Sequence, residues 1–223
     1  MNSVTKYLPL MIFLLVTLAF RHLEANAQTY LPVGPQTNVP VDAVTGGGWT
    51  ECYRDTYNIA MDANTVLSSC PGELLMLSCR PTGSDTLTLL AQGLRSDVTF
   101  DTGVNSNLVH DANGVGWYFN NTGDGKFGQS WGFIREGDSI NKNNCDVANI
   151  DANDERLCWH LNGDNGYRCG ATQNIFDDSY ERIVYTGRGE RAIPTLSEWG
   201  LIAMAGLMGI VGFIVIRRRK VAA

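Results

Sequence analysis

The chain has 223 residues, 44% of them hydrophobic, and a formal net charge of −6 at pH 7. Residues 28–192 alone hold 21 acidic and 11 basic side chains, which gives this part a charge of about −10. With so few basic groups to neutralise phosphates, the composition argues against nucleic acid as a partner. A span of this length is enough for one domain with a core of its own.

The N-terminal segment has the pattern of a secretory signal peptide. Lys6 precedes an apolar stretch at 7–20, and Ala25-Asn26-Ala27 offers small residues at a cleavage site. We therefore expect residues 1–27 to pass through the Sec translocon and to be removed by signal peptidase. The mature chain would then begin at Gln28.

The rest of the exported part divides by composition into three stretches. Residues 28–45 contain three prolines and are expected to form an extended lead-in or an edge segment. A β-rich ectodomain is expected at 46–186, because short apolar runs there alternate with turns rich in Gly, Asn and Asp. A short polar linker is expected at 187–192.

The hydrophobic pattern of the ectodomain predicts many short strands and little helix. One short helix is expected within 56–69, with Asn58 or Asp62 near its start. This pattern favours an all-β fold of the β-sandwich or jelly-roll kind, with the strands near Trp49 and Val184 close together. The predicted strands are 49–53, 73–79, 86–90, 98–100, 116–119, 130–134, 156–160 and 181–185.

The cysteines all lie in the exported part of the chain. An even number of cysteines in a secreted domain predicts disulfide bonds, and the spacing matches no zinc site. Three lie in the N-terminal half of the domain and three in the C-terminal half, so at least one bridge must join the halves. The sequence does not choose among the possible pairings of Cys52, Cys70, Cys79, Cys145, Cys158 and Cys169.

An apolar run near the C-terminus predicts one transmembrane helix at 200–216. The run has 17 residues without a charge, and at about 1.5 Å per residue it just reaches across a hydrocarbon core. The basic residues that follow favour the cytoplasmic side of the membrane. They are Arg217, Arg218, Arg219 and Lys220.

A short motif precedes this run and consists of Ile193, Pro194, Thr195, Leu196, Ser197, Glu198, Trp199 and Gly200. The motif, the apolar run and the basic cluster together, at 193–220, resemble the IPTL-CTERM sorting domain. This domain is a relative of the PEP-CTERM signals that exosortases process in Gram-negative bacteria. The resemblance implies an exosortase-type membrane peptidase as partner, an inner-membrane stage, cleavage near the motif, and delivery to the cell surface or the extracellular matrix. It assigns no activity to the ectodomain.

One sequence pattern is typical of a catalytic nucleophile. Ser130 lies in a G-x-S-x-G pattern, but the residues around it do not fit the strand and helix that a nucleophile elbow needs. A triad would require His160 together with Asp151 or Asp154. His160 and His110 could each act as a general base, although isolated histidines are more often structural. Because no catalytic arrangement is convincing, we expect that the protein is not an enzyme.

An acidic loop offers the oxygen ligands that calcium prefers. It has no EF-hand pattern, because Arg156 stands where the glycine would be. Asp and Asn also fill turns for backbone reasons alone, so no cofactor is required and calcium is only a possible one. The candidate ligands are Asp146, Asn149, Asp151, Asn153 and Glu155.

Aromatic residues beside the polar loops provide a second candidate site. Trp117, Tyr118 and Trp159 could stack on sugar rings if they are exposed, or pack in the core if they are not. In the first case the partner would be an extracellular polysaccharide.

These features together predict an exported surface or matrix protein with a role in adhesion, polysaccharide binding or structure. The role is inferred by analogy with the sorting signal. Two alternatives stay open. One is a secreted carbohydrate-active or other hydrolase, which would need a pair of facing carboxylates. The other is an unprocessed single-pass membrane protein with a periplasm-facing binding domain.

Overall fold

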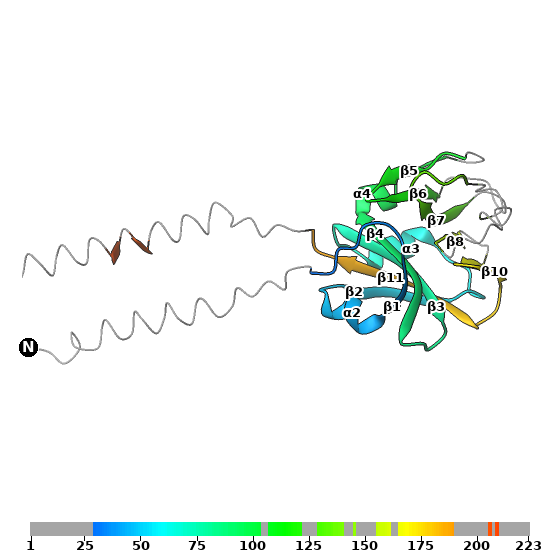
Figure 1. Ribbon diagram of the computed structural model, residues 1–223, viewed down its shortest axis with the longest axis horizontal. Helices are drawn as coiled ribbons and strands as arrows, with labels where there is room; N and C mark the ends of the chain where they lie inside the picture. Colours follow the sequence, from blue (N-terminus) through cyan, green and yellow to red (C-terminus); the bar gives the residue numbers. More distant parts are fainter. Residues whose placement is uncertain are drawn as a thin grey trace, which may run out of the picture. The chain divides into compact units, whose positions relative to one another are not determined.

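The structure is a computed structural model that describes residues 29–103, 107–121, 129–140, 145, 155–161, 165–189, 205–206 and 208–209. The chain divides into two compact units, Met1–Gly189 and Glu190–Ala223. The first contains the β-rich domain (Figure 1). The expected signal peptide lies outside the described residues.

Little of the expected transmembrane helix at 200–216 is described. Residues 205–206 and 208–209 are helical. Within the described part of the chain, no helix combines the length and the apolar character needed to cross a membrane.

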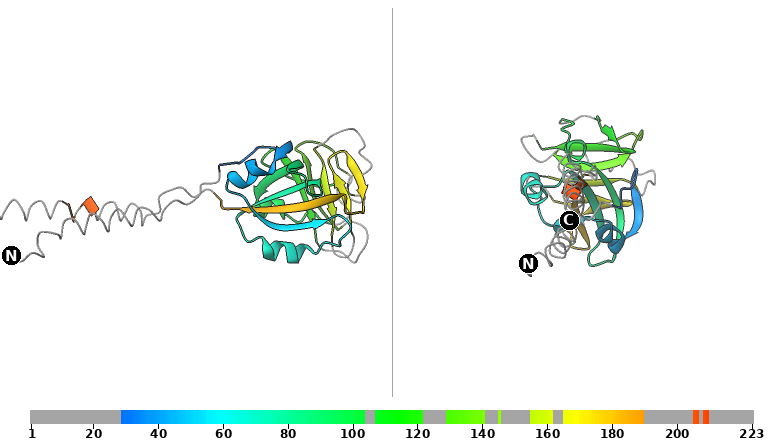
Figure 2. Two further views of the ribbon diagram at one scale, coloured as in Figure 1. Left: turned by 90° about the horizontal axis from the view of Figure 1, so that it is seen from below. Right: turned by 90° about the vertical axis from the view of Figure 1, so that its left-hand side faces the viewer.

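A five-stranded antiparallel sheet is built from both ends of the domain, in the order β1-β4-β3-β11-β2. The first and last predicted strands are indeed neighbours, since Val184 lies opposite Tyr53 (Figure 2). Within the segment 28–45, for which an extended lead-in or an edge segment was expected, residues 36–40 form the outermost strand β1. The bounds are β1 (Gln36–Pro40), β2 (Thr50–Thr56), β3 (Leu74–Pro81), β4 (Thr86–Leu94) and β11 (Tyr180–Gly187).

A six-stranded antiparallel sheet holds the middle of the chain, and its strands follow one another in chain order. This meander differs from the expected jelly-roll connectivity, in which successive strands cross between two sheets. The bounds are β5 (His110–Ala112), β6 (Val115–Asn120), β7 (Ser130–Arg135), β8 (Leu157–His160), β9 (Tyr167–Cys169) and β10 (Thr172–Ile175).

Three short helices accompany the sheets, namely α2 (Val41–Gly46), α3 (Ala63–Ser69) and α4 (Arg95–Val98). The predicted helix is confirmed as α3. The predicted strand at 98–100 is wrong, because the chain completes a helical turn there and the amide of Thr99 donates to the carbonyl of Arg95. The pattern also missed α2, whose six residues are too few to show a helical period.

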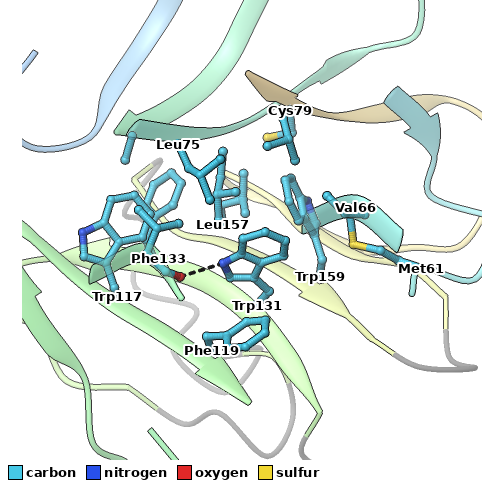
Figure 3. Close-up of a cluster of buried hydrophobic side chains, with 14 of the residues drawn as sticks. Met61, Val66, Leu75, Cys79, Trp117, Phe119, Trp131, Phe133, Leu157 and Trp159 are labelled. Atoms are coloured by element: carbon cyan, nitrogen blue, oxygen red, sulfur yellow. Dashed lines mark hydrogen bonds between the residues drawn. The ribbon is translucent and has the colours of Figure 1, made fainter. Parts of the chain in front are cut away.

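The two sheets pack against each other over one hydrophobic core. Side chains of β3 and β4 meet those of β6, β7 and β8 there (Figure 3). Three tryptophans lie at its centre, and the rings of Trp131 and Trp159 meet edge to face at 6.0 Å. The indole of Trp131 donates a hydrogen bond of 2.9 Å to the carbonyl of Val98, which fixes α4 to the core.

The other face of the five-stranded sheet is covered by the segment at 29–46. Val44 packs with Met76, Ile183 and Tyr185 in a second hydrophobic cluster. The strand β3 is buried from Leu74 to Arg80 because both faces of its sheet are covered. The expected lead-in is therefore an integral part of the domain.

All six cysteines form disulfide bonds, as predicted. Cys79 in β3 and Cys169 in β9 connect the two sheets and provide the expected link between the halves of the domain. The other two bridges are local: Cys52 pairs with Cys70, and Cys145 with Cys158.

Replacing Asp62 with alanine should lower the free energy of unfolding by about 1 kcal/mol, because this residue caps α3. Its carboxylate accepts hydrogen bonds of 2.7 Å from the amide and the hydroxyl of Thr65, and these bonds lower the pKa of Asp62. The contribution should therefore be present above about pH 4 and be lost as the pH falls further.

Urea unfolding at pH 7 and pH 3 tests this cap. The control is Ser68→Ala, which removes an exposed hydroxyl within α3 and should change stability by less than about 0.5 kcal/mol. Equal effects of the two substitutions would contradict the capping role of Asp62.

Candidate functional site

The G-x-S-x-G serine does not lie on a nucleophile elbow. Ser130 begins the strand β7, and a strand rather than a helix follows it. It is nevertheless placed directly opposite His160 of β8. Opposite residues of antiparallel strands share a face. Because the neighbouring pair Trp131 and Trp159 faces the core, Ser130 and His160 face the outer side of the sheet.

The contacts around Ser130 do not make it a nucleophile with a base. Its hydroxyl oxygen is buried and has no hydrogen-bond partner in the described structure, so His160 does not form a hydrogen bond with it. The Nδ1 atom of His160 lies 3.2 Å from the carbonyl oxygen of Asn165, and its ring packs on Tyr167 at 4.5 Å. The candidate acids Asp151 and Asp154 lie outside the described residues.

The calcium hypothesis concerns a loop of which one candidate ligand is described. Both carboxylate oxygens of Glu155 accept hydrogen bonds from the guanidinium of Arg135, at 2.5 and 2.6 Å. Within the described ranges, no three His, Cys, Asp or Glu side chains are grouped to hold a metal. The remaining candidates, Asp146, Asn149, Asp151 and Asn153, fall outside these ranges, and calcium binding there stays a prediction.

The aromatic residues considered for sugar stacking are core residues. The side chains of Trp117, Tyr118 and Trp159 are all 0% exposed. The hydroxyl of Tyr118 donates to the carbonyl of Leu157 at 2.9 Å, and the indole of Trp117 donates to Ala112 at 3.2 Å. Their polar atoms are thus used inside the domain, and these rings offer no surface to a ligand.

A different aromatic residue is exposed at the edge of the six-stranded sheet. Phe100, in the turn after α4, is 46% exposed. Its ring lies against the imidazole of His110 in β5, with centroids 4.4 Å apart and planes 15° apart. The Nε2 atom of His110 is 2.9 Å from a carboxylate oxygen of Asp97 in α4. We call Phe100, His110 and Asp97 the edge cluster.

The edge cluster is not recognisable from the sequence, for a physical reason. The hydrophobic pattern places Phe100 in a strand, and His110 lies ten residues further along the chain. The stack forms because the turn after α4 brings Phe100 back to β5, a contact that no local spacing encodes. The sequence offers one weak signal, which is that Asp97 and His110 both lie close to Phe100 along the chain.

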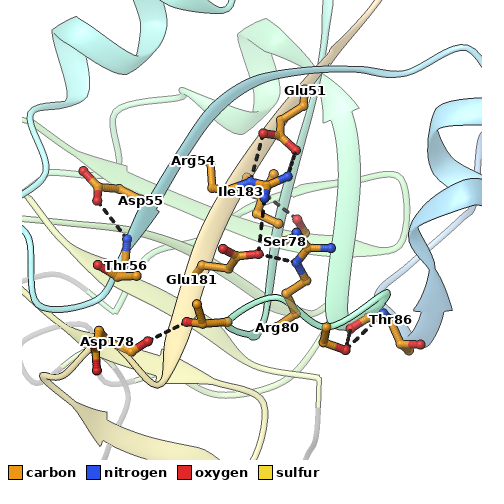
Figure 4. A network of polar contacts seen from close by, with 12 residues as sticks. Glu51, Arg54, Asp55, Thr56, Ser78, Arg80, Thr86, Asp178, Glu181 and Ile183 are labelled. Atoms are coloured by element: carbon orange, nitrogen blue, oxygen red, sulfur yellow. Dashed lines mark hydrogen bonds and ion pairs between the residues drawn. The ribbon is translucent and has the colours of Figure 1, made fainter.

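A charged network crosses three strands of the five-stranded sheet (Figure 4). The guanidinium of Arg80 pairs with the carboxylate of Glu181, and both side chains are only 6% exposed. Arg54 also approaches Glu181, at 3.8 Å, and binds Glu51 at the exposed end of the network. Burial raises the pKa of the nearby Tyr185 to about 12. The two arginines and the two glutamates pair with one another, so the network holds β2, β3 and β11 together.

One buried arginine is held without an acidic partner among the described ion pairs. The guanidinium of Arg182 donates hydrogen bonds to the carbonyls of Thr56 and Ile59, at 3.1 and 2.5 Å, and lies over the ring of Tyr57. Burial lowers the pKa of Arg182. The contacts show that this side chain anchors the turn after β2.

Comparison with known proteins identifies one segment of the chain. Residues 191–220 match the family model of the IPTL-CTERM motif, which confirms the resemblance of the motif, the apolar run and the basic cluster. No curated protein and no solved structure matches the chain significantly. Such a motif implies export to the cell surface of a bacterium by an exosortase-like sorting system. The chain therefore carries an IPTL-CTERM sorting motif at residues 191–220.

Proposed function

We propose that this protein is a surface or extracellular-matrix component of a Gram-negative bacterium, with an adhesive, polysaccharide-binding or structural role. The match of residues 191–220 to the IPTL-CTERM motif is the observation that carries the proposal. The signal peptide at 1–27 directs the chain to the Sec translocon. An exosortase-type peptidase in the inner membrane then recognises 193–200 and releases the domain to the outside.

The domain has the properties that a protein outside the cytoplasm needs. Three disulfide bonds persist in an oxidising compartment and not in the cytosol. The buried ion pair of Arg80 and Glu181 is engaged inside the domain, which is consistent with a structural role. A hydrolase that used Ser130 as its nucleophile would need a base hydrogen-bonded to the hydroxyl, and this hydroxyl has no hydrogen-bond partner in the described structure.

The mass of the mature protein tests the sorting step. We expect the chain from fractionated cells to begin at Gln28, to lack the tail from Arg217 to Ala223, and to be found outside the inner membrane. Replacing Ile193, Pro194, Thr195 and Leu196 with alanine should leave the tail in place. Replacing Arg188 with alanine, upstream of the motif, should still allow the tail to be removed.

The opposite result would support a different interpretation of the C-terminal segment. A wild-type chain that keeps its complete tail and stays in the inner membrane would overturn the proposal. It would favour the single-pass membrane protein with a periplasm-facing domain.

A further inference from the structure

The edge cluster presents an aromatic ring to solvent in a fixed orientation. One face of the Phe100 ring is covered by His110, and the residue as a whole is 46% exposed. A ligand that covered the exposed part of this residue would remove apolar area from water.

The orientation of the ring is set by contacts from two elements. The hydrogen bond between His110 and Asp97 joins β5 to α4 at 2.9 Å, and the indole of Trp131 holds the end of α4 through the carbonyl of Val98. The phenyl ring is therefore backed by a second ring that is itself fixed. A ligand that stacks on a fixed ring loses less binding free energy to ordering of the site.

The size of the exposed surface argues against a protein partner. A stable protein interface covers about 800 Å² on each side, whereas an aromatic side chain contributes roughly 150–250 Å². Leu108, at 56% exposure, is another exposed apolar side chain in the chain segment that leads into β5. A ligand with a single flat apolar face fits this surface better.

The chemistry of the surroundings selects the kind of ligand. The negative face of an aromatic ring attracts polarised C–H groups, which one face of a hexose ring presents. The carboxylate of Asp97, which contacts His110 in the edge cluster, can accept hydrogen bonds from hydroxyl groups. Because residues 28–192 carry a charge of about −10, an anionic polymer would be repelled.

We propose that the edge cluster is a binding site for a neutral polysaccharide, with Phe100 stacking on a hexose ring and His110 and Asp97 positioning it. This inference rests on the proposed function, because it names the ligand and the site of the polysaccharide-binding role. The proposed stacking residue is therefore Phe100, which solvent reaches, and not Trp117 or Trp159, which are buried.

Affinity electrophoresis of the full-length chain in detergent tests the site. The gels contain dextran, a soluble β-glucan or mannan as neutral polymers, or alginate as an anionic one. We expect at least one neutral polymer to retard the protein and Phe100→Ala to weaken this binding about tenfold. Phe100→Leu, which keeps an apolar side chain and loses the ring, should weaken it similarly.

Phe176 provides the matched control, because it is 48% exposed and packs against Tyr167, a residue outside the edge cluster. Phe176→Ala should bind within about twofold of the wild type. Equal losses in Phe176→Ala and Phe100→Ala, retardation by alginate alone, or no retardation by any neutral polymer would each overturn the inference. A chain that is processed and exported but binds no neutral polymer would refute this site and leave the proposed sorting intact.

Discussion

Replacing Cys79 and Cys169 together with alanine is expected to lower the free energy of unfolding by about 4–5 kcal/mol. The bridge closes a long stretch of chain, since its cysteines are 90 residues apart in sequence. In the chain-entropy account, a longer closed loop removes more freedom from the unfolded state. The effect should be large because this bridge also joins the two sheets.

The bridge between Cys52 and Cys70 provides an internal comparison. These cysteines are 18 residues apart, so the same account gives about 3 kcal/mol for the double alanine variant. Both bridges contact the main core, which makes the loss of packing similar. The difference between the variants therefore reports mainly on loop length.

Urea unfolding followed by tryptophan fluorescence is the appropriate measurement, since Trp117, Trp131 and Trp159 are buried between the sheets. The variant that lacks the bridge between Cys79 and Cys169 should unfold at the lower urea concentration. If the loss of the short bridge between Cys52 and Cys70 destabilised the protein more, loop closure would not be the main contribution.

The pairing of these cysteines shows what a sequence can and cannot provide. The even number and the exported context predicted disulfide bonds, because both follow from composition. The choice of Cys169 as the partner of Cys79 depends on which strands of the two sheets face each other. That arrangement is a tertiary property, and the sequence contains no local signal for it.

Strands were predicted well where burial is uniform. The run from Leu74 to Cys79 was recognised as β3 because both faces of its sheet are covered. In contrast, β10 was missed because Thr172–Ile175 contains three polar residues and one apolar residue and so shows no hydrophobic alternation. The strand β9 has only three residues, which are too few to define a period.

The aromatic residues were ambiguous for a related reason. Trp117 and Tyr118 are neighbours in β6 and therefore point to opposite faces of the sheet. Neither side chain reaches solvent, because all residues of β6 are buried. Alternation identifies two faces of a strand, but it does not tell which of them another segment covers. The sequence could therefore name the aromatic candidates and not decide between a ligand platform and the core.

Glu181→Gln is expected to lower the free energy of unfolding by about 3 kcal/mol, because it leaves the buried guanidinium of Arg80 without a compensating charge. Both side chains are 6% exposed, so water cannot replace the carboxylate. Glutamine has nearly the same volume as glutamate. The change therefore removes the charge without opening a cavity.

The same network contains its own control at the exposed end. Glu51 binds Arg54 there, with side chains that are 33% and 42% exposed, and water screens such a pair strongly. Glu51→Gln should therefore change the free energy of unfolding by less than about 1 kcal/mol. The contrast between the two substitutions measures the effect of burial on an otherwise similar pair.

A double variant separates the loss of the pair from the cost of the unpaired charge. Arg80→Met combined with Glu181→Met removes both charges, and apolar side chains in place of a buried ion pair are often neutral or stabilising. The double variant should therefore be more stable than Glu181→Gln in the same urea measurement. If Glu181→Gln cost no more than Glu51→Gln, the buried pair would not stabilise the junction of β3 and β11, and the hydrogen bonds between these strands would be sufficient to hold it.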